Sequence, residues 1–116
     1  MADGAAEVWL TISRVANRHG VTPRALRYYE AKGLLDPVRK ASGVRFYGRQ
    51  AQARAELLVR LRSLGLSISE IRTIVCHDSG SRLQRIAVAE ALDDRILRVR
   101  DQLSRLEQAR RLLPES

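Results

Sequence analysis

The hydrophobic residues near the start of the chain repeat at the spacing of a short helix. Ile12, Val15 and Ala16 fall on one face at 3.6 residues per turn. Thr11 precedes them as a good N-cap, and Gly20 follows as a C-terminal stop. The pattern predicts a helix of barely two turns.

A second short helix follows after a tight turn. Thr22 is its predicted N-cap, and Pro23 occupies the first helical position, where a missing N–H and a fixed φ are tolerated. Gly33 marks its end, just after Lys32. Two short helices joined in this way are typical of a helix-turn-helix, in which the second helix enters the major groove of DNA.

The second helix has two different sides. At 100° per residue, Leu26, Tyr29 and Glu30 fall on the side that is predicted to pack against the rest of the domain. The opposite side is predicted to face DNA and carries Arg24, Arg27, Tyr28 and Ala31. We interpret Arg24 and Arg27 as DNA-reading residues, because an arginine at the start of a recognition helix can donate two hydrogen bonds to guanine or hold a phosphate.

After Leu35 the helical period stops, and residues 36–47 read as two short strands around a Ser-Gly turn. This hairpin would be the wing of a winged helix-turn-helix domain. Its basic residues are Arg39, Lys40 and Arg45, which we expect to reach phosphates beside the groove that the helix occupies.

Four of the five aromatic residues lie in the second helix and the wing. Tyr29 and Phe46 are expected to pack, because this part of the chain has few other large apolar groups. For Tyr28 and Tyr47, packing and DNA contact are equally open.

A third helix is predicted from about Arg49 to Leu64, with Leu57, Leu61 and Leu64 at helical spacing and Gly65 as its stop.

The next four residues, Ser-Ile-Ser-Glu over 67–70, form a capping box that predicts the start of a short fourth helix. Ile68, Ile71 and Val75 would face inward, and residues 77–81 would form a connecting loop.

Residues 82–113 predict one long helix, about 48 Å long at 1.5 Å per residue. Its apolar seam alternates steps of four and three, and Arg110 alone interrupts it. The seam consists of Leu92, Ile96, Val99, Leu103, Leu106 and Leu113. Because so long a heptad seam has no core of its own to enter, its expected partner is the same helix of a second subunit, in an antiparallel coiled coil. Folding back onto the short N-terminal helices is the alternative.

These elements predict a mainly α protein in three parts: a mobile arm (1–10), a winged helix-turn-helix DNA-binding domain (11–76) and a coiled-coil dimerisation helix (82–113). A chain of 116 residues supports one modest core. Hydrophobic residues make up 45% and aromatic residues 4% of the chain, which favours a helical core of Leu, Ile, Val and Ala.

Positive charge is concentrated in the predicted DNA-binding domain. The formal net charge is +8, and residues 14–62 hold 12 basic and 3 acidic side chains. Residues 63–116 hold 9 basic and 8 acidic ones. Basic residues that coincide with turns and short helices favour nucleic acid over a membrane surface. The alternative is a solvated arginine-rich surface, since 19 of the 21 basic residues are Arg.

The sequence offers no evident catalytic or metal centre. It holds no Ser/His/Asp set, phosphate-binding glycine loop or His-x-x-x-His pair, and its single cysteine cannot form an internal disulfide. It has no apolar run of 18 residues and no signal-peptide pattern. We therefore expect a cytoplasmic protein that is not an enzyme and needs no cofactor.

Several motifs resemble the MerR family of bacterial transcription regulators. They are residues 21–30 (VTPRALRYYE), 32–35 (KGLL), 42–47 (SGVRFY) and 61–71 (LRSLGLSISEI). The motif Arg-Tyr-Tyr-Glu alone would be weak, but these motifs in this order are specific, and the resemblance continues into the long helix.

The resemblance implies a mechanism. Family dimers bind a near-palindromic promoter site, then bend and untwist it to bring the promoter elements into register for RNA polymerase. It assigns DNA-binding or wing-motif positions to Arg24, Arg27, Tyr28, Arg45 and Tyr47. In one position the chain departs from the pattern: Val44 stands where the family usually has Tyr, so a hydroxyl that could donate to a phosphate is missing.

Cys76 lies where the fourth helix gives way to the dimerisation helix, near the effector site of metal-sensing family members. The two-cysteine loop of those members is absent from the sequence, so no metal site is expected. Cys76 could act as a single reactive thiol, as in thiol-sensing relatives, but a buried inert cysteine is the favoured interpretation. His19 is interpreted as a helix C-terminal residue.

A second function class shares the winged-helix head: architectural DNA-bending proteins of excisionase type. Such small proteins commonly lack a coiled coil, so the long C-terminal helix favours a dimeric transcription regulator.

Overall fold

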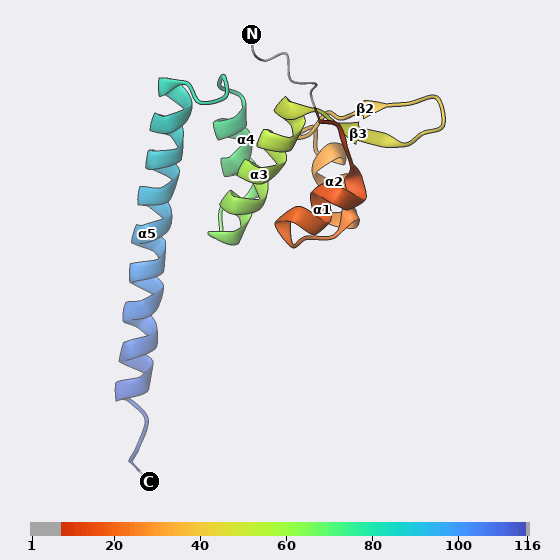
Figure 1. Ribbon diagram of the computed structural model, residues 1–116. Coiled ribbons are helices and arrows are strands. Elements are labelled where there is room, and N and C mark those ends of the chain that lie inside the picture. Colours follow the sequence, from red (N-terminus) through yellow and green to blue (C-terminus); the bar gives the residue numbers. More distant parts are fainter. Residues whose placement is uncertain (1–7, 116) are drawn as a thin grey trace. The chain divides into compact units, whose positions relative to one another are not determined.

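The computed structural model describes residues 8–115 (Figure 1). In chain order its elements are β1 (Leu10–Thr11), α1 (Ile12–His19), α2 (Pro23–Ala31), β2 (Val38–Arg39), β3 (Arg45–Tyr47), α3 (Arg49–Ser63), α4 (Ile68–Val75) and α5 (Arg82–Arg111). The mainly α winged helix-turn-helix fold with a long C-terminal helix is confirmed. The chain divides into two compact units after Leu64, inside the segment 11–76 that was expected as one domain.

The two helices of the helix-turn-helix begin at the predicted caps. Thr11 Oγ1 accepts the N–H of Arg14 at 3.4 Å, and Thr22 Oγ1 accepts the N–H of Ala25 at 3.1 Å. Gly20 ends α1 with φ 67°, a left-handed conformation in which a side chain would be strained. Because a side-chain cap satisfies an otherwise unpaired N–H, the local sequence defines both helix starts.

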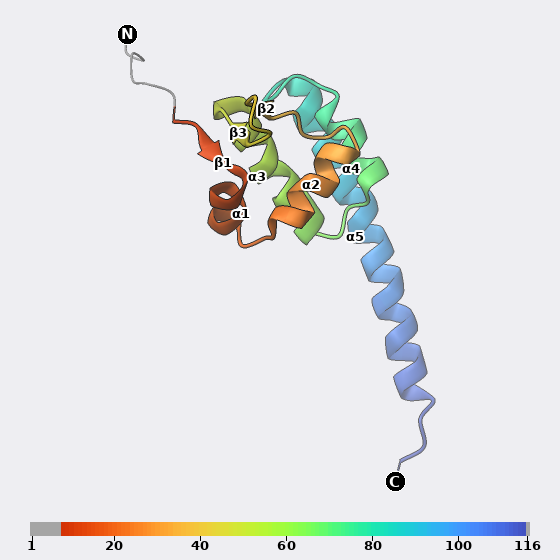
Figure 2. The same cartoon turned by 90° about the vertical axis from the view of Figure 1, so that its right-hand side faces the viewer.

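The wing belongs to a three-stranded antiparallel sheet in the order β1-β3-β2 (Figure 2). Leu10 pairs with Tyr47, and Arg39 pairs with Arg45. Strand β1 was not predicted, so the expected mobile arm over 1–10 is wrong at Leu10; residues 1–7 of that arm lie outside the described part of the chain. The side chain of Gln52 holds the segment before β1 against the end of β3, because its Nε2 donates to the carbonyls of Val8 at 2.6 Å and Tyr47 at 2.8 Å.

The core of the first unit is built from α1, α2, α3 and the wing sheet. Its fully buried large side chains include those of Val15, Leu26, Leu34, Tyr47 and Leu58. Helix α3 buries Ala55, Leu58 and Leu61, whereas Leu64, which was grouped with the packing face of this helix, is the half-exposed C-cap.

In the second unit, α4 lies beside the first half of α5, and the second half of α5 extends beyond it (Figure 1). The predicted capping box is present: Ser67 Oγ accepts the Glu70 N–H at 3.1 Å, and Glu70 accepts the Ser67 N–H at 2.9 Å. Glu70 also pairs with Arg98 of α5 at 2.9 Å. Gln84 is buried and donates to the carbonyl of Ile74 at 3.3 Å, which fixes the other end of α4 to α5.

Within residues 8–115, none of the helices combines the length and apolar character that a membrane crossing requires.

Candidate nucleic-acid interface

Helix α2 presents one basic surface to solvent. Arg24 and Arg27 are exposed, while Leu26 and Tyr29 on the other side are buried. The predicted division of α2 into a packing side and an outward side is therefore confirmed. Because its packing residues anchor α2 from below, the outward guanidinium groups are displayed on a rigid element, which suits base readout.

Tyr28 lies on the same outward surface and is 48% exposed. Its ring meets Tyr29 edge to face, with centroids 6.0 Å apart and planes 63° apart. Lys32 Nζ lies 5.5 Å from the Tyr28 centroid, within the range of a cation–π contact. These contacts restrain the ring while leaving it accessible.

The turn of the wing carries the second basic surface. The Lys40 N–H donates to the Val44 carbonyl at 3.0 Å, and the Gly43 N–H donates to the Lys40 carbonyl at 2.8 Å. Lys40 is exposed, and its Nζ lies 5.7 Å from the Phe46 ring centroid. In Figure 1 the β2–β3 hairpin projects beyond the helices of its unit, a position from which Lys40 could reach a phosphate.

A buried carboxylate joins α2 to the wing. Glu30 accepts hydrogen bonds from Arg39 Nη2 at 2.9 Å, Arg45 Nε at 2.8 Å and Tyr47 Oη at 3.4 Å. The amphipathic period placed Glu30 on the packing side, but it gave no sign of these three partners, which lie 9, 15 and 17 residues away. Glu30 is thus a candidate functional residue that sequence reasoning missed.

This cluster changes the interpretation of two wing residues. Tyr47 is completely buried, so of its two open interpretations packing is correct, and the DNA-binding role that the resemblance suggested for it is wrong. Arg45 is mostly buried against Glu30, whereas Arg39 remains more than half exposed. Burial raises the pKa of Tyr47, as do the charge and hydrogen bond of Glu30, so the phenol stays protonated and donates.

A hollow of about 230 Å³ lies between α2 and the base of the wing. Its lining includes three cations, Arg27, Arg39 and Arg45, and two anions, Glu30 and Asp36. Such a surplus of guanidinium groups beside an exposed helix face can attract a phosphate oxygen.

Helix α5 leaves its apolar seam uncovered in the single chain. Leu92 is partly exposed, and four further seam residues of the helix are between 42% and 61% exposed: Ile96, Val99, Leu103 and Leu106. The helix ends at Arg111, two residues before the predicted end, so Leu113, which is 68% exposed, lies beyond it. Apolar side chains so aligned on one helix mark an interaction surface.

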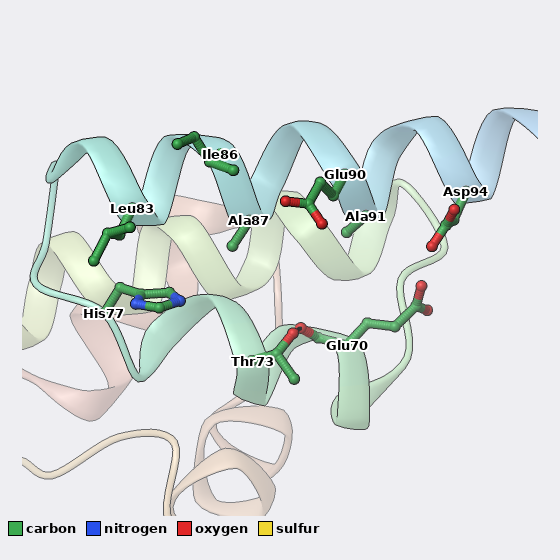
Figure 3. Close-up of a pocket in the computed structure, with 9 residues that line it drawn as sticks. All are labelled: Glu70, Thr73, His77, Leu83, Ile86, Ala87, Glu90, Ala91 and Asp94. Atoms are coloured by element: carbon green, nitrogen blue, oxygen red, sulfur yellow. Dashed lines mark hydrogen bonds between the residues drawn. The ribbon is translucent and has the colours of Figure 1, made fainter.

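A groove of about 370 Å³ runs between α4 and α5 (Figure 3). Leu83 and Ile86 of α5 contribute half-exposed apolar surface, and His77 closes one end. Glu90 and Asp94 add carboxylates on the α5 side. At 100° per residue, Leu83, Glu90 and Asp94 lie on the side of α5 away from the apolar seam, so the groove is a separate feature of this unit.

Cys76 is the C-cap of α4 and is exposed, so the expectation of a buried cysteine is wrong. Its Sγ lies 3.2 Å from the carbonyl of Thr73, which satisfies its weak donor. His19 ends α1, as predicted. Among residues 8–115, no group of three or more His, Cys, Asp and Glu side chains is placed to hold a metal ion.

Comparison with known proteins gives one consistent result. Two family profiles match, "MerR HTH family regulatory protein" over residues 10–77 and "MerR, DNA binding" over residues 52–115. The chain is 30% identical over 107 residues to an HTH-type transcriptional regulator of Haemophilus influenzae, a ZntR homolog, and the match covers 91% of this chain and 79% of that protein.

Solved structures agree with the sequence matches. The regulator PbrR691 from Ralstonia metallidurans CH34, solved in complex with lead(II), aligns with a TM-score of 0.70 at 25% identity, over 86% of this chain and 78% of that one. HiNmlR, a regulator that lacks the sensor domain and was solved bound to promoter DNA, shares the fold with a TM-score of 0.63 at 22% identity, over 88% and 78% of the two chains.

Proposed function

Because the chain belongs to the MerR family of DNA-binding transcription regulators, we propose that it acts as a homodimer that binds a near-palindromic promoter site and distorts it. The observation that carries the proposal is the apolar seam of α5, which the single chain leaves open. A second copy of α5 would cover it and place two winged helix-turn-helix units on one duplex. Each of these units, residues 8–64, is called a head below.

Charge favours an antiparallel pairing of the two helices. Residues 82–96 of α5 are neutral overall, whereas residues 97–111 carry a net charge of +3. A parallel pair would bring the two basic halves together, while an antiparallel pair sets each basic half against a neutral half that contains Glu90, Asp93 and Asp94.

The DNA contacts in this proposal come from two surfaces of one head. Arg24, Arg27 and Tyr28 of α2 would meet base edges and nearby phosphates, and Arg39 and Lys40 of the wing would hold the flanking backbone. Arg45 and Tyr47 act inside the head. The dimer would work as a binding protein in the cytoplasm, with promoter DNA and RNA polymerase as its partners, rather than as an enzyme.

The architectural, excisionase-type alternative is less well supported. The profile described as "MerR, DNA binding" matches residues 52–115, so the family likeness includes α5 and is not confined to the reading head.

The test replaces one seam residue by a charge. Leu103→Glu places carboxylates in the dimer seam, whereas Gln108→Glu, on the outward side of the same helix, is the matched control. Light scattering of the wild type and the control should give twice the 13.1 kDa chain mass, and Leu103→Glu should give the monomer and lose promoter binding. A monomeric wild type that still selects a promoter sequence would overturn the dimer.

A further inference from the structure

Two positive charges lie opposite each other at the base of the wing. Arg39 and Arg45 are direct cross-strand neighbours in the β2–β3 ladder. Like charges opposite one another destabilise a strand pair, and the Arg45 side chain is only 23% exposed, so water screens it poorly. A two-stranded hairpin with this pair needs a counter-charge at a fixed place.

Glu30 supplies that counter-charge from another element. Its side chain is 7% exposed, and it lies at the end of α2, the helix that displays Arg27 one turn earlier. A carboxylate this buried is retained only where donors satisfy it, and here both wing strands supply them. The position of the wing and that of the recognition helix are thereby coupled through one side chain.

The three donors are not equivalent. Tyr47 is buried and Arg45 nearly so, whereas the Arg39 side chain is 57% exposed. Two donors can therefore hold Glu30 permanently, and the third can leave it without opening the core. Arg39 also borders the hollow between α2 and the wing that Arg27 lines.

We propose that Glu30 is a positioning residue for DNA recognition, which fixes the wing on α2 through Arg45 and Tyr47. Arg39 is the mobile member of the cluster and exchanges Glu30 for a DNA phosphate when the protein binds. Since Arg45 stays with Glu30, it orients the wing and is not itself a phosphate contact. This inference rests on the proposed DNA-binding surface of α2 and the wing.

The exchange predicts that one substitution, Glu30→Gln, changes the affinities for unrelated DNA and for the specific site in opposite directions. Glu30→Gln keeps the shape of the side chain but frees the two arginines from an ion pair and raises the net charge by one. Binding to unrelated DNA should strengthen, because that binding depends on charge. Binding to the specific site should weaken by roughly ten-fold, because the wing is no longer fixed relative to α2. A substitution that only destabilised the head would weaken binding to the specific site and to unrelated DNA alike.

The experiment uses the full chain and two duplexes, one selected by the wild-type protein from a random pool and one with the selected site scrambled. Affinities are measured by fluorescence anisotropy over a range of salt, and thermal unfolding verifies that each variant is folded. For Glu30→Gln we expect weaker binding to the selected duplex and tighter binding to the scrambled one. The double variant Glu30→Gln/Arg39→Ala should lose the gain on scrambled DNA.

If Glu30→Gln does not fold, the variant Tyr47→Phe provides the test. It removes one donor to Glu30 without a change of charge, so it should weaken binding to the selected duplex and leave the scrambled duplex unaffected. Equal losses on both duplexes by a folded Glu30→Gln, or no effect of a folded Tyr47→Phe, would overturn the positioning role alone. A wild type that binds both duplexes equally would overturn the proposed function, and the positioning role with it.

Discussion

Removing one guanidinium from the reading surface should separate sequence readout from general attraction to DNA. Arg27 is exposed on α2, and the residues that hold this helix in place, Leu26 and Tyr29, are untouched by Arg27→Ala. We expect its effect on unfolding free energy to stay within about 0.5 kcal/mol, as for ordinary surface substitutions. Any larger loss of DNA binding then reports contact with DNA rather than damage to the fold.

The magnitude follows from the contact that Arg27 would make. A bidentate arginine–guanine pair contributes about 1–3 kcal/mol of discrimination, or roughly 5- to 160-fold in affinity for the selected site. Lys40 is a compact charge on the wing turn, so Lys40→Ala should weaken binding to every sequence alike. Because each phosphate contact releases counterions, its loss should reduce the slope of log K against log salt by about 0.9.

The assay compares both variants on the selected and scrambled duplexes at several salt concentrations. Arg111→Ala, an exposed arginine near the end of α5, controls for the loss of one positive charge. The expected result is a loss of preference with Arg27→Ala, a parallel loss on both duplexes with Lys40→Ala, and little change with the control. If Arg27→Ala lowers affinity for both duplexes by the same small factor, the assignment of α2 as the reading surface is refuted.

Two further predictions concern the second unit. Gly65 has φ 89°, and an added Cβ would lie 2.5 Å from Arg95 Nη2, the end of a flexible side chain that can move away. Gly65→Ala should therefore cost roughly the 1–2 kcal/mol of a left-handed side chain, and Gly20→Ala, with φ 67° and open space, should cost about the same. Urea unfolding of both variants gives the comparison, and a loss below about 0.5 kcal/mol in either would contradict a backbone cost. Two donors lower the pKa of Glu70 in the folded chain: first the backbone N–H of Ser67, then the Arg98 side chain. The carboxylate of Glu70 therefore stabilises the fold at a pH above the ordinary pKa of a glutamate. This stabilisation is lost as the pH falls through the lowered pKa. Thermal unfolding from neutral to acidic pH should therefore show a smaller acid-induced loss in Glu70→Gln than in the wild type, and identical pH profiles would contradict this role.

The elements that the sequence predicted are those with local causes. Thr22 with Pro23 begins α2, and the capping box begins α4, because each cap is satisfied within a few residues. The α5 seam could be predicted equally well, since its heptad spacing extends over several turns.

The features that the sequence did not reveal depend on contacts between distant residues. Strand β1 has two residues, too few for a period, and Gln52 of α3 holds the chain beside it. Arg45 was expected to point outward, and the interpretation of Tyr47 stayed open, because the alternation of a three-residue strand gives little information about burial. Their common partner, Glu30, belongs to a different element, so only the folded unit brings the three together.

The most direct test of the central claim is the shape of the DNA in the complex. In the proposed dimer the α5 coiled coil would link the two heads, and the duplex would have to adapt to place α2 of each head in successive major grooves. Fluorescence transfer between dyes at the two ends of a selected duplex should show bending when the protein binds. In a set of duplexes that differ only in the uncontacted central base pairs, a flexible pyrimidine–purine step should bind more tightly, because bending costs about 1–6 kcal/mol and depends on sequence. Straight DNA with equal affinity across the set would contradict a dimer that distorts its promoter site.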